Sequence, residues 1–247
     1  MNKLPLYKIL IRANVASRRK CNQAIKEAKV KVNNKVITEP TFLVDIEKDT
    51  VNVDGKPITK RDFLKEDFVY YILNKPAGYI STVKDTHHRK TVLDLIKDKR
   101  RIYPVGRLDK DTEGLLILTN DGQLTYRLTH PSFKIDKIYR LIIKPKIVKE
   151  DIERLNNGVI IDNYKKVSAK TKLIKNYKDQ NRSELELIIH QGIKRQIKKM
   201  LSVLGYEVIS LKRIGIGDIK LTNLKRGECR RLTKDELNYL KKKVGMS

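Results

Sequence analysis

YPVGRLDKDTEGLLILTNDG, residues 103–122, is the stretch that decides the fold. Residues 115–118 are a short apolar run closed by the turn signal Asn-Asp-Gly at 120–122, which is typical of a fully buried strand. Just before it, one arginine and three carboxylates fall within seven residues: Arg107, Asp109, Asp111 and Glu113. Loops fixed on a rigid scaffold are where proteins place reactive groups. The stretch therefore predicts an acidic loop held by a core strand.

The sequence around this strand mixes strand and helix patterns. Strands are predicted at residues 69–74, 136–144, 166–174, 183–189 and 206–221. Helices are predicted at residues 123–129, 148–156, 193–204 and 233–243. Because strands and helices do not alternate strictly, we expect an α+β domain over residues 68–247, with a mixed, mostly antiparallel sheet flanked by helices.

Residues 1–62 are expected to form a separate small domain of helices and a short hairpin. Ser17 is a good N-cap for a helix whose apolar residues recur at helical spacing. Alternation around Asn33-Asn34 predicts a hairpin over residues 29–37. Charge density rises at residues 62–67, which are the predicted linker.

Basic residues gather at two places in this small domain. Three of them occupy the first helical turn after Ser17, where cations oppose the helix dipole: Arg18, Arg19 and Lys20. A phosphate docked at the helix N-terminus would make that arrangement favourable, and simple solvation is the alternative. Lys29 and Lys31 fall on the outward face of the hairpin. The pattern predicts a surface that binds RNA phosphates.

Composition points to the same class of partner. The 247 residues include 55 Lys and Arg against 29 Asp and Glu, a formal charge of +26, which indicates a polyanionic partner. No apolar run approaches the roughly 20 residues that span a bilayer, and the first residues lack the features of a secretory signal. The two cysteines fit a reducing compartment, and no histidine lies at zinc-finger spacing from them. We expect a soluble, cytoplasmic protein without a metal site.

A second informative segment is HQGIKRQIKKM, residues 190–200. Its apolar residues form one stripe of the helix predicted there. Arg195, Lys198 and Lys199 are spaced i, i+3 and i+4, so we expect them to share another face and converge on one anion.

A third informative segment is DKIYR, residues 136–140, at the start of a predicted strand. Tyr139 shares one face of that strand with Leu141 and Ile143, so its ring is expected to point into a largely apolar cavity. A purely structural place in the core is the alternative for this tyrosine.

These segments together resemble the RsuA/RluB-type family of ribosomal RNA pseudouridine synthases over nearly the whole chain. The supporting stretches are YYILNKPAGYISTVKD at 70–85, DKIYRLII at 136–143 and GIKRQIKKM at 192–200. Residues 6–37 resemble the S4 RNA-binding domain, with Asn14 and Ala28 where that family usually has glycine. The likeness is greater to the branch that acts on large-subunit RNA.

The resemblance implies roles for four residues. Asp109 matches the catalytic aspartate, and Arg107 matches the arginine that helps to hold the target nucleotide out of its helix. Tyr139 matches the tyrosine that stacks on the uracil and takes part in proton transfer. Lys198 matches the basic residue that pairs with the aspartate, where the family usually has arginine, and Arg195 is the alternative partner.

The implied activity isomerises a uridine of ribosomal RNA, free or in an assembly intermediate, by an enzyme expected to be monomeric. No cofactor motif is present, and the implied reaction needs no redox step, group donor or metal. Two other functions stay open from the sequence. One is a non-catalytic RNA-binding or ribosome-associated factor, and the other is a magnesium-dependent nuclease using Asp109, Asp111 and Glu113.

Overall fold

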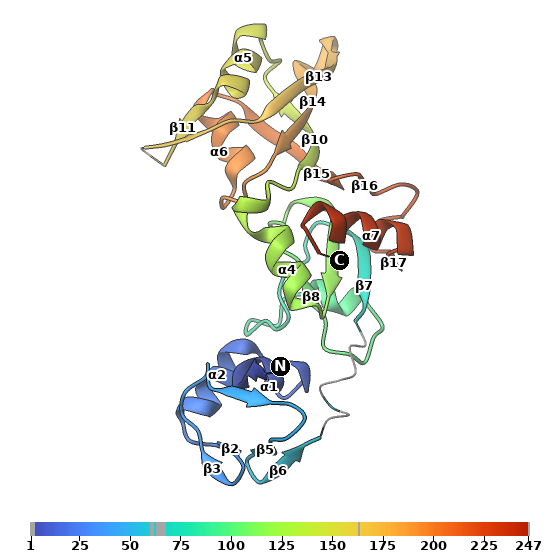
Figure 1. The fold of residues 1–247 in the computed structure, drawn as a ribbon. Helices are drawn as coiled ribbons and strands as arrows, with labels where there is room; N and C mark the ends of the chain where they lie inside the picture. The colour runs from blue at the N-terminus through green and yellow to red at the C-terminus, as the bar shows by residue number, and fades with distance from the viewer. Residues whose placement is uncertain (1–2, 60–61, 63–67, 163, 247) are drawn as a thin grey trace. The chain divides into compact units, whose positions relative to one another are not determined.

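The structure, a computed structural model, describes residues 3–59, 62, 68–162 and 164–246. It contains two compact units, Met1–Asp67 and Phe68–Ser247 (Figure 1). Apart from Asp62, the predicted linker lies outside the described residues. None of the described helices is long and apolar enough to cross a membrane.

The N-terminal unit packs two helices, α1 (Leu6–Arg12) and α2 (Arg18–Lys26), with short strands around a core of its own. One pair and one four-stranded sheet, ordered β3-β2-β5-β6, contain its strands: β1 (Lys3–Pro5), β2 (Val30–Val32), β3 (Lys35–Val36), β4 (Leu43–Asp45), β5 (Val51–Val53) and β6 (Lys56–Ile58). Ser17 caps α2 by accepting from the Lys20 amide at 3.3 Å. The turn at Asn33-Asn34, with φ of +49° and +65°, joins β2 to β3 as the sequence predicts.

Ala28 occupies the place of the usual glycine at the end of α2. The Lys29 amide donates to the Ala24 carbonyl and the Ala28 amide to the Ile25 carbonyl, which is a Schellman motif. Ala28 therefore has φ of +60°, in the left-handed region that its Cβ disfavours. Asn14, the other departure from glycine, has φ of +56°, which asparagine tolerates.

Replacing Ala28 with glycine is expected to stabilise the N-terminal unit by about 1 kcal/mol, because relief of the left-handed strain exceeds the added entropy of the unfolded chain. Hydrogen exchange of the α2 and β2 amides in the full chain measures the gain. Asn14→Gly is the matched control and should give a smaller gain. An equal or larger gain from Asn14→Gly would contradict the strain assigned to Ala28.

The second unit is built on one mixed sheet of nine strands. Its order is β13-β14-β10-β15-β9-β7-β17, with β16 paired to β15 and β8 paired to β9. Among the described strands of this sheet, the pairs are antiparallel except β15 with β9. The strands are β7 (Tyr70–Lys75), β8 (Tyr103–Pro104), β9 (Glu113–Thr119), β10 (Lys137–Lys144), β13 (Lys170–Tyr177), β14 (Arg182–Ile189), β15 (Glu207–Ile216), β16 (Ile219–Lys220) and β17 (Cys229–Arg231). The predicted α+β class with a mostly antiparallel sheet is confirmed.

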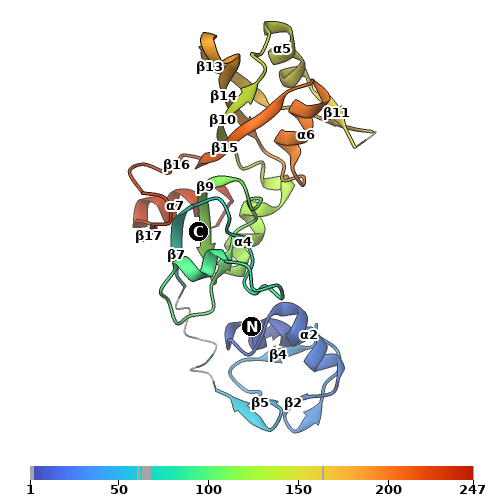
Figure 2. The same cartoon turned by 180° about the vertical axis from the view of Figure 1, so that it is seen from behind.

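Helices flank this sheet, and a separate hairpin stands beside it. Figures 1 and 2 show α5 and α6 beside the part of the sheet that contains β10, β14 and β15, and α4 and α7 beside β7 and β9. The elements are α4 (Gly122–Thr129), α5 (Lys149–Asn157), α6 (Gln196–Val203), α7 (Lys234–Lys243), the hairpin β11 (Val159–Ile161) with β12 (Lys165–Val167), and 3₁₀ turns at Val92–Leu95, Pro131–Phe133 and Lys178–Gln180.

Three predicted boundaries were wrong, each for a local reason. The strand predicted at 166–174 is split between β12 and β13, because the Ala169 amide donates to the Leu155 carbonyl of α5. The strand predicted at 206–221 ends at Ile216, and a turn at Gly217 leads back into β16. The helix predicted from 193 begins at Gln196, because Arg195 has φ of +55° and cannot continue a right-handed helix.

Strand β9 is buried on both faces, as its continuous apolar run predicts. Leu116 and Leu118 belong to one apolar core, whereas Leu115 and Ile117 belong to another on the opposite face. At its first residues β9 pairs in parallel with β15. Gly114 there lies so near β15 that a Cβ would approach the backbone of Arg213 to within 3 Å. The acidic loop is therefore fixed to two neighbouring strands of the sheet.

Candidate active site

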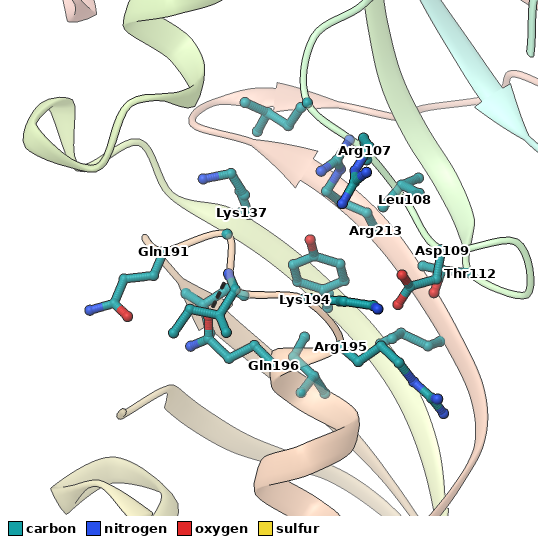
Figure 3. A pocket seen from close by; sticks show the side chains of 18 of the residues that line it. Arg107, Leu108, Asp109, Thr112, Lys137, Gln191, Lys194, Arg195, Gln196 and Arg213 are labelled. Carbon is teal, nitrogen blue, oxygen red and sulfur yellow. Dashed lines mark hydrogen bonds between the residues drawn. The ribbon is translucent and has the colours of Figure 1, made fainter. Parts of the chain in front are cut away.

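A cavity opens where the acidic loop meets β10, β15 and the segment before α6 (Figure 3). Its volume is about 250 Å³. Because a cavity of about 150 Å³ holds one benzene molecule, this one has room for a single aromatic base. The side chains that matter for its chemistry are Arg107, Asp109, Thr112, Lys137, Tyr139, Lys194, Arg195, Lys198 and Arg213.

Asp109 lies on the loop between β8 and β9 and is half-buried at the cavity wall. The described residues include no hydrogen-bond or ion-pair partner for its carboxylate, so both of its oxygens can serve a ligand. The loop backbone turns tightly here, with the Thr112 amide donating to the Asp109 carbonyl at 3.1 Å. Asp109 is thus a rigidly placed carboxylate facing a base-sized cavity.

Lys75, at the end of β7, fixes the loop through hydrogen bonds to its backbone. Its side chain is fully buried, and its ammonium donates to three backbone carbonyls, those of Pro76 at 3.1 Å, Lys110 at 3.2 Å and Thr112 at 2.7 Å. Burial lowers the pKa of Lys75 to about 8, against the opposing effect of the nearby carboxylates of Asp111, Glu113 and Asp109. Two of the three acceptors, the carbonyls of Lys110 and Thr112, directly follow Asp109 on the loop, so Lys75 fixes the backbone there.

The segment after β7 adds a second clamp. Ser81 Oγ donates to the Leu108 carbonyl at 3.0 Å and accepts from the Leu108 amide at 3.1 Å. The Gly78 amide donates to the Lys110 carbonyl at 2.8 Å, with Gly78 at φ of +91°. Leu108 and Lys110, on either side of Asp109, are therefore bonded through their backbone groups to the segment YYILNKPAGYIS, independently of the Asp109 carboxylate.

Tyr139 lines the cavity from β10, as predicted, and is 8% exposed. In the ladder between β10 and β15 it pairs with Arg213, which lines the same cavity. Lys137, two residues earlier, donates to the His190 carbonyl at 2.9 Å. Burial, together with the charge of Arg213, lowers the pKa of Lys137 to about 8.

The family resemblance implies that Lys198 pairs with Asp109. In the structure Lys198 instead forms its ion pair with Asp111. This hydrogen bond lowers the pKa of Asp111. Lys199 instead pairs with Asp162 at 2.6 Å, and Arg195 precedes the helix. Of the three cations predicted to converge on one anion, Lys198 and Arg195 both act on the Asp111 carboxylate, since the charge of Arg195 also contributes to lowering its pKa, whereas Lys199 is drawn to Asp162.

The remaining carboxylates of the loop are also paired with cations. Glu113 lies 3.0 Å from Arg226, and Asp111 is held by Lys198. A divalent metal shared by Asp109, Asp111 and Glu113 would need these oxygens to converge, so the arrangement does not favour the nuclease alternative.

Arg107 and Arg195 are exposed side chains at the cavity, close to exposed Lys194. Figure 3 shows Arg107, Asp109, Lys194, Arg195 and Arg213 around one space. The site thus combines a carboxylate, an aromatic ring and several cations, a set suited to a nucleotide.

Sequence reasoning missed Lys75, Lys137 and Arg213 as site residues. A signal was present for two of them. Lys75 ends an apolar strand, and Arg213 alternates with Leu211 on the buried face of β15. A charge in a core position of a strand needs a buried partner, which marks it for attention.

The predicted RNA-binding residues of the N-terminal unit lie on its surface. Arg18, Arg19 and Lys20 are exposed in the first turn of α2, with the Arg18 guanidinium 5.1 Å from the centre of the Tyr7 ring. Lys31 is exposed on β2, while Lys29 forms an ion pair with Glu27 at 2.6 Å. A shallow groove along α2 is lined by Arg18, Arg19, Asn22, Gln23, Lys26 and Glu27.

Comparison with known proteins gives the family. A family profile described as RNA pseudouridylate synthase matches residues 69–203, and an S4 domain profile matches residues 4–51. The chain is 42% identical over 237 residues to a Bacillus subtilis protein named ribosomal large subunit pseudouridine synthase B, covering 96% of this chain and 95% of the relative. It is 40% identical over 248 residues to an uncharacterized RNA pseudouridine synthase of Aquifex aeolicus, covering 100% of this chain and 97% of the relative.

A solved structure agrees with these relatives. A crystal structure of a pseudouridylate synthase superposes with a TM-score of 0.68 at 27% identity, covering 96% of this chain and 99% of that one. The resemblance found in the sequence is confirmed by the profiles and the relatives. The chain belongs to the RNA pseudouridine synthases, which isomerise uridine to pseudouridine in RNA, and it carries an N-terminal S4 domain.

Proposed function

We propose that this enzyme modifies one uridine of large-subunit ribosomal RNA, with Asp109 as its essential residue. The observation that supports this most directly is the Asp109 carboxylate, free of protein partners in the described part of the chain, at a base-sized cavity lined by Tyr139 and cations. The name of the Bacillus subtilis relative supports the choice of the large subunit.

The target uridine is proposed to leave its stack and enter the cavity. Unstacking costs a few kcal/mol, which stacking on Tyr139 and contacts from Arg107 offset. Asp109 then acts either as a nucleophile at C1′ of the ribose or as a base at C2′, and in both cases the C1′–N1 bond breaks. The base turns, C5 bonds to C1′, and the C5 proton is transferred to N1, so the product is an isomer of the substrate.

Lys198 is proposed to act on the loop through Asp111. Its pairing with Asp111 keeps the loop carboxylates from repelling one another and leaves Asp109 free for the ribose. Arg195 is exposed at the cavity and is proposed to contact RNA phosphate.

Residues 1–62 are proposed to be the RNA-binding domain and residues 68–247 the catalytic domain of a monomer that works in the cytoplasm. The exposed cations of α2, of β2 and of the turn between them would bind phosphates: Arg18, Arg19, Lys20, Lys29 and Lys31. With a formal charge of +26, the affinity for RNA should fall steeply as salt rises.

Mapping of pseudouridine across both ribosomal RNAs, in cells with and without this gene, tests the proposed substrate. One signal in large-subunit RNA should disappear and return when the gene is restored. Purified enzyme should then modify that uridine either in the naked RNA or only in assembly particles. Loss of a signal in small-subunit RNA, or of none, would contradict the assignment.

The rate should fall as pH rises above about 8, with the pKa of Lys75. The ammonium donates three hydrogen bonds to carbonyls, and the neutral amine can donate only two. Because the unfolded pKa of 10.5 is higher, the unfolded chain binds more protons at Lys75 between pH 8 and 10.5, so the contribution of this lysine to stability rises there. Loss of rate without loss of fold is therefore expected.

Single-turnover rates and circular dichroism from pH 6 to 10 measure both effects. Lys137→Met is the control, because the pKa of Lys137 is also lowered to about 8. This variant should keep the alkaline fall in rate. If the fall vanished in Lys137→Met, Lys137 and not Lys75 would be the group that titrates.

A further inference from the structure

Arg213 is a buried cation whose guanidinium is only partly hydrogen-bonded by the described residues. It is 2% exposed, yet it lines the cavity that contains Asp109. Its Nε donates to the Leu115 carbonyl at 2.7 Å, while its Nη2 is buried and has no hydrogen-bond partner among the described residues. No carboxylate of the described chain forms an ion pair with it. A buried charge in this condition is costly, so an acceptor from outside the protein is expected to complete it.

The nearest surroundings of Arg213 do not supply that acceptor. Lys137 is a cation on the same side of the cavity, and the charge of Arg213 contributes to lowering its pKa. Arg107 adds a third positive group to the cavity wall. The part of the cavity next to Arg213 therefore favours an electron-rich group of a bound ligand.

The backbone fixes Arg213 between the two groups on which the proposed reaction depends. Across one ladder it is the register partner of Tyr139 on β10. Across the other it is the register partner of Gly114, the second residue of β9, directly after the Asp109 loop. The close approach at Gly114 and the bond to Leu115 leave little freedom for this segment. Such placement suits a group that must act on a base stacked at Tyr139.

Depth distinguishes Arg213 from the other cations of the cavity. Arg107, Lys194 and Arg195 are exposed, where the phosphates of an RNA strand can reach them. Arg213 is almost fully covered, and the part of a flipped nucleotide that enters furthest is its base. A base carbonyl is therefore a better match for Nη2 than a phosphate oxygen.

We propose that Arg213 is a further catalytic residue, whose Nη2 donates a hydrogen bond to a carbonyl oxygen of the flipped uracil. When the C1′–N1 bond breaks, its electron pair stays on the base and is delocalised onto O2 and O4. Either Asp109 forms a bond to C1′, or it takes the C2′ proton, so charge balances in both routes. Arg213 stabilises the negative base until C5 bonds to C1′, the Asp109 bond breaks or the C2′ proton returns, and the C5 proton moves to N1.

This inference rests on the proposed function, since it needs a uracil in the cavity beside Asp109. The experiment pairs enzyme variants with single-atom changes in the substrate. Synthetic RNA carrying the mapped target as uridine, 2-thiouridine or 4-thiouridine is treated with wild type, Arg213→Lys and Arg213→Gln. Sulfur accepts hydrogen bonds poorly, so it weakens the contact at one carbonyl at a time. Single-turnover rates are compared as ratios of thio to oxo substrate.

For one of the two sulfur positions, the ratio of the thio rate to the oxo rate should differ about tenfold or more between wild type and both Arg213 variants. This is the size expected for a hydrogen bond to a charged donor. The position that does so identifies O2 or O4 as the acceptor. Arg107→Gln is the matched control, another cavity arginine, and should keep the wild-type ratios at both positions. Equal ratios in wild type and in both Arg213 variants would overturn the inference.

Two controls distinguish a failure of this inference from a failure of the proposed function or of folding. Formation of pseudouridine by wild type on the uridine RNA tests the proposed function, whatever the role of Arg213. Arg213→Lys keeps the charge and much of the length, so it serves if Arg213→Gln does not fold. A purely structural Arg213 would lower all rates by the same factor and leave the ratios unchanged.

Discussion

Asp109→Asn is expected to abolish formation of pseudouridine while leaving binding of RNA nearly unchanged. The amide has the same shape as the carboxylate but can neither attack C1′ nor take a proton from C2′. A general base alone is worth about 10²–10⁴-fold, and loss of a nucleophile removes the route entirely. Because the described chain gives the Asp109 carboxylate no bonded partner, the fold should not change. Turnover and RNA affinity of the purified variant provide the measurement.

Asp111→Asn is the matched control, a carboxylate two residues away on the same loop. Its side chain is 64% exposed and pairs with Lys198, and exposed pairs contribute little, about 0–1 kcal/mol. We expect at most a several-fold loss of rate. If Asp109→Asn stayed active, or if both variants lost activity equally, Asp109 would not be the essential group. A non-catalytic RNA-binding factor would then be the better account.

Lys75→Met is expected to cause the second largest effect, although Lys75 does not line the cavity. Methionine fills the volume but removes three hydrogen bonds to backbone carbonyls, of which the Lys110 carbonyl keeps the bond from the Gly78 amide, and this should cost about 3 kcal/mol in the free energy of unfolding. For a unit of this size the midpoint of thermal unfolding should fall by about 6 to 12 °C. Well below that midpoint, the rate should still fall about 10²-fold, because the loop no longer holds Asp109 in place.

Lys110→Met separates this effect from a general loss of positive charge. Lys110 is exposed on the same loop, and its backbone carbonyl still accepts from Lys75 in the variant. Its stability and its rate at saturating RNA should stay close to wild type. A full rate for Lys75→Met at a temperature where it is folded would show that the bonds to the loop carbonyls do not position Asp109.

The sequence was sufficient for the parts of the fold that depend on local pattern. The apolar run of β9, the cap at Ser17 and the turn at Asn33-Asn34 each follow from a few neighbouring residues. The three wrong boundaries depend on contacts from elsewhere, such as the bond from Ala169 to Leu155. The left-handed Arg195 has no local signal comparable to a glycine.

For the site, the sequence located the loop and the tyrosine but not the pairing of charges. Tyr139 could be placed at a cavity by strand alternation, and it lies there. Lys198 could not be assigned to Asp111 rather than Asp109, because two carboxylates two residues apart differ only in the direction of the loop. Arg213 was overlooked because its partners, Gly114 and Leu115, lie about a hundred positions earlier in the chain.

The parallel pairing of β9 with β15 has a consequence for biosynthesis. It joins Glu113 to Lys212 and Gly114 to Arg213, so the cavity is closed by segments that leave the ribosome far apart in time. The N-terminal unit has its own apolar core and can form while the rest is still being translated. Such distant contacts also slow folding. A nascent chain could therefore hold RNA well before it could modify it.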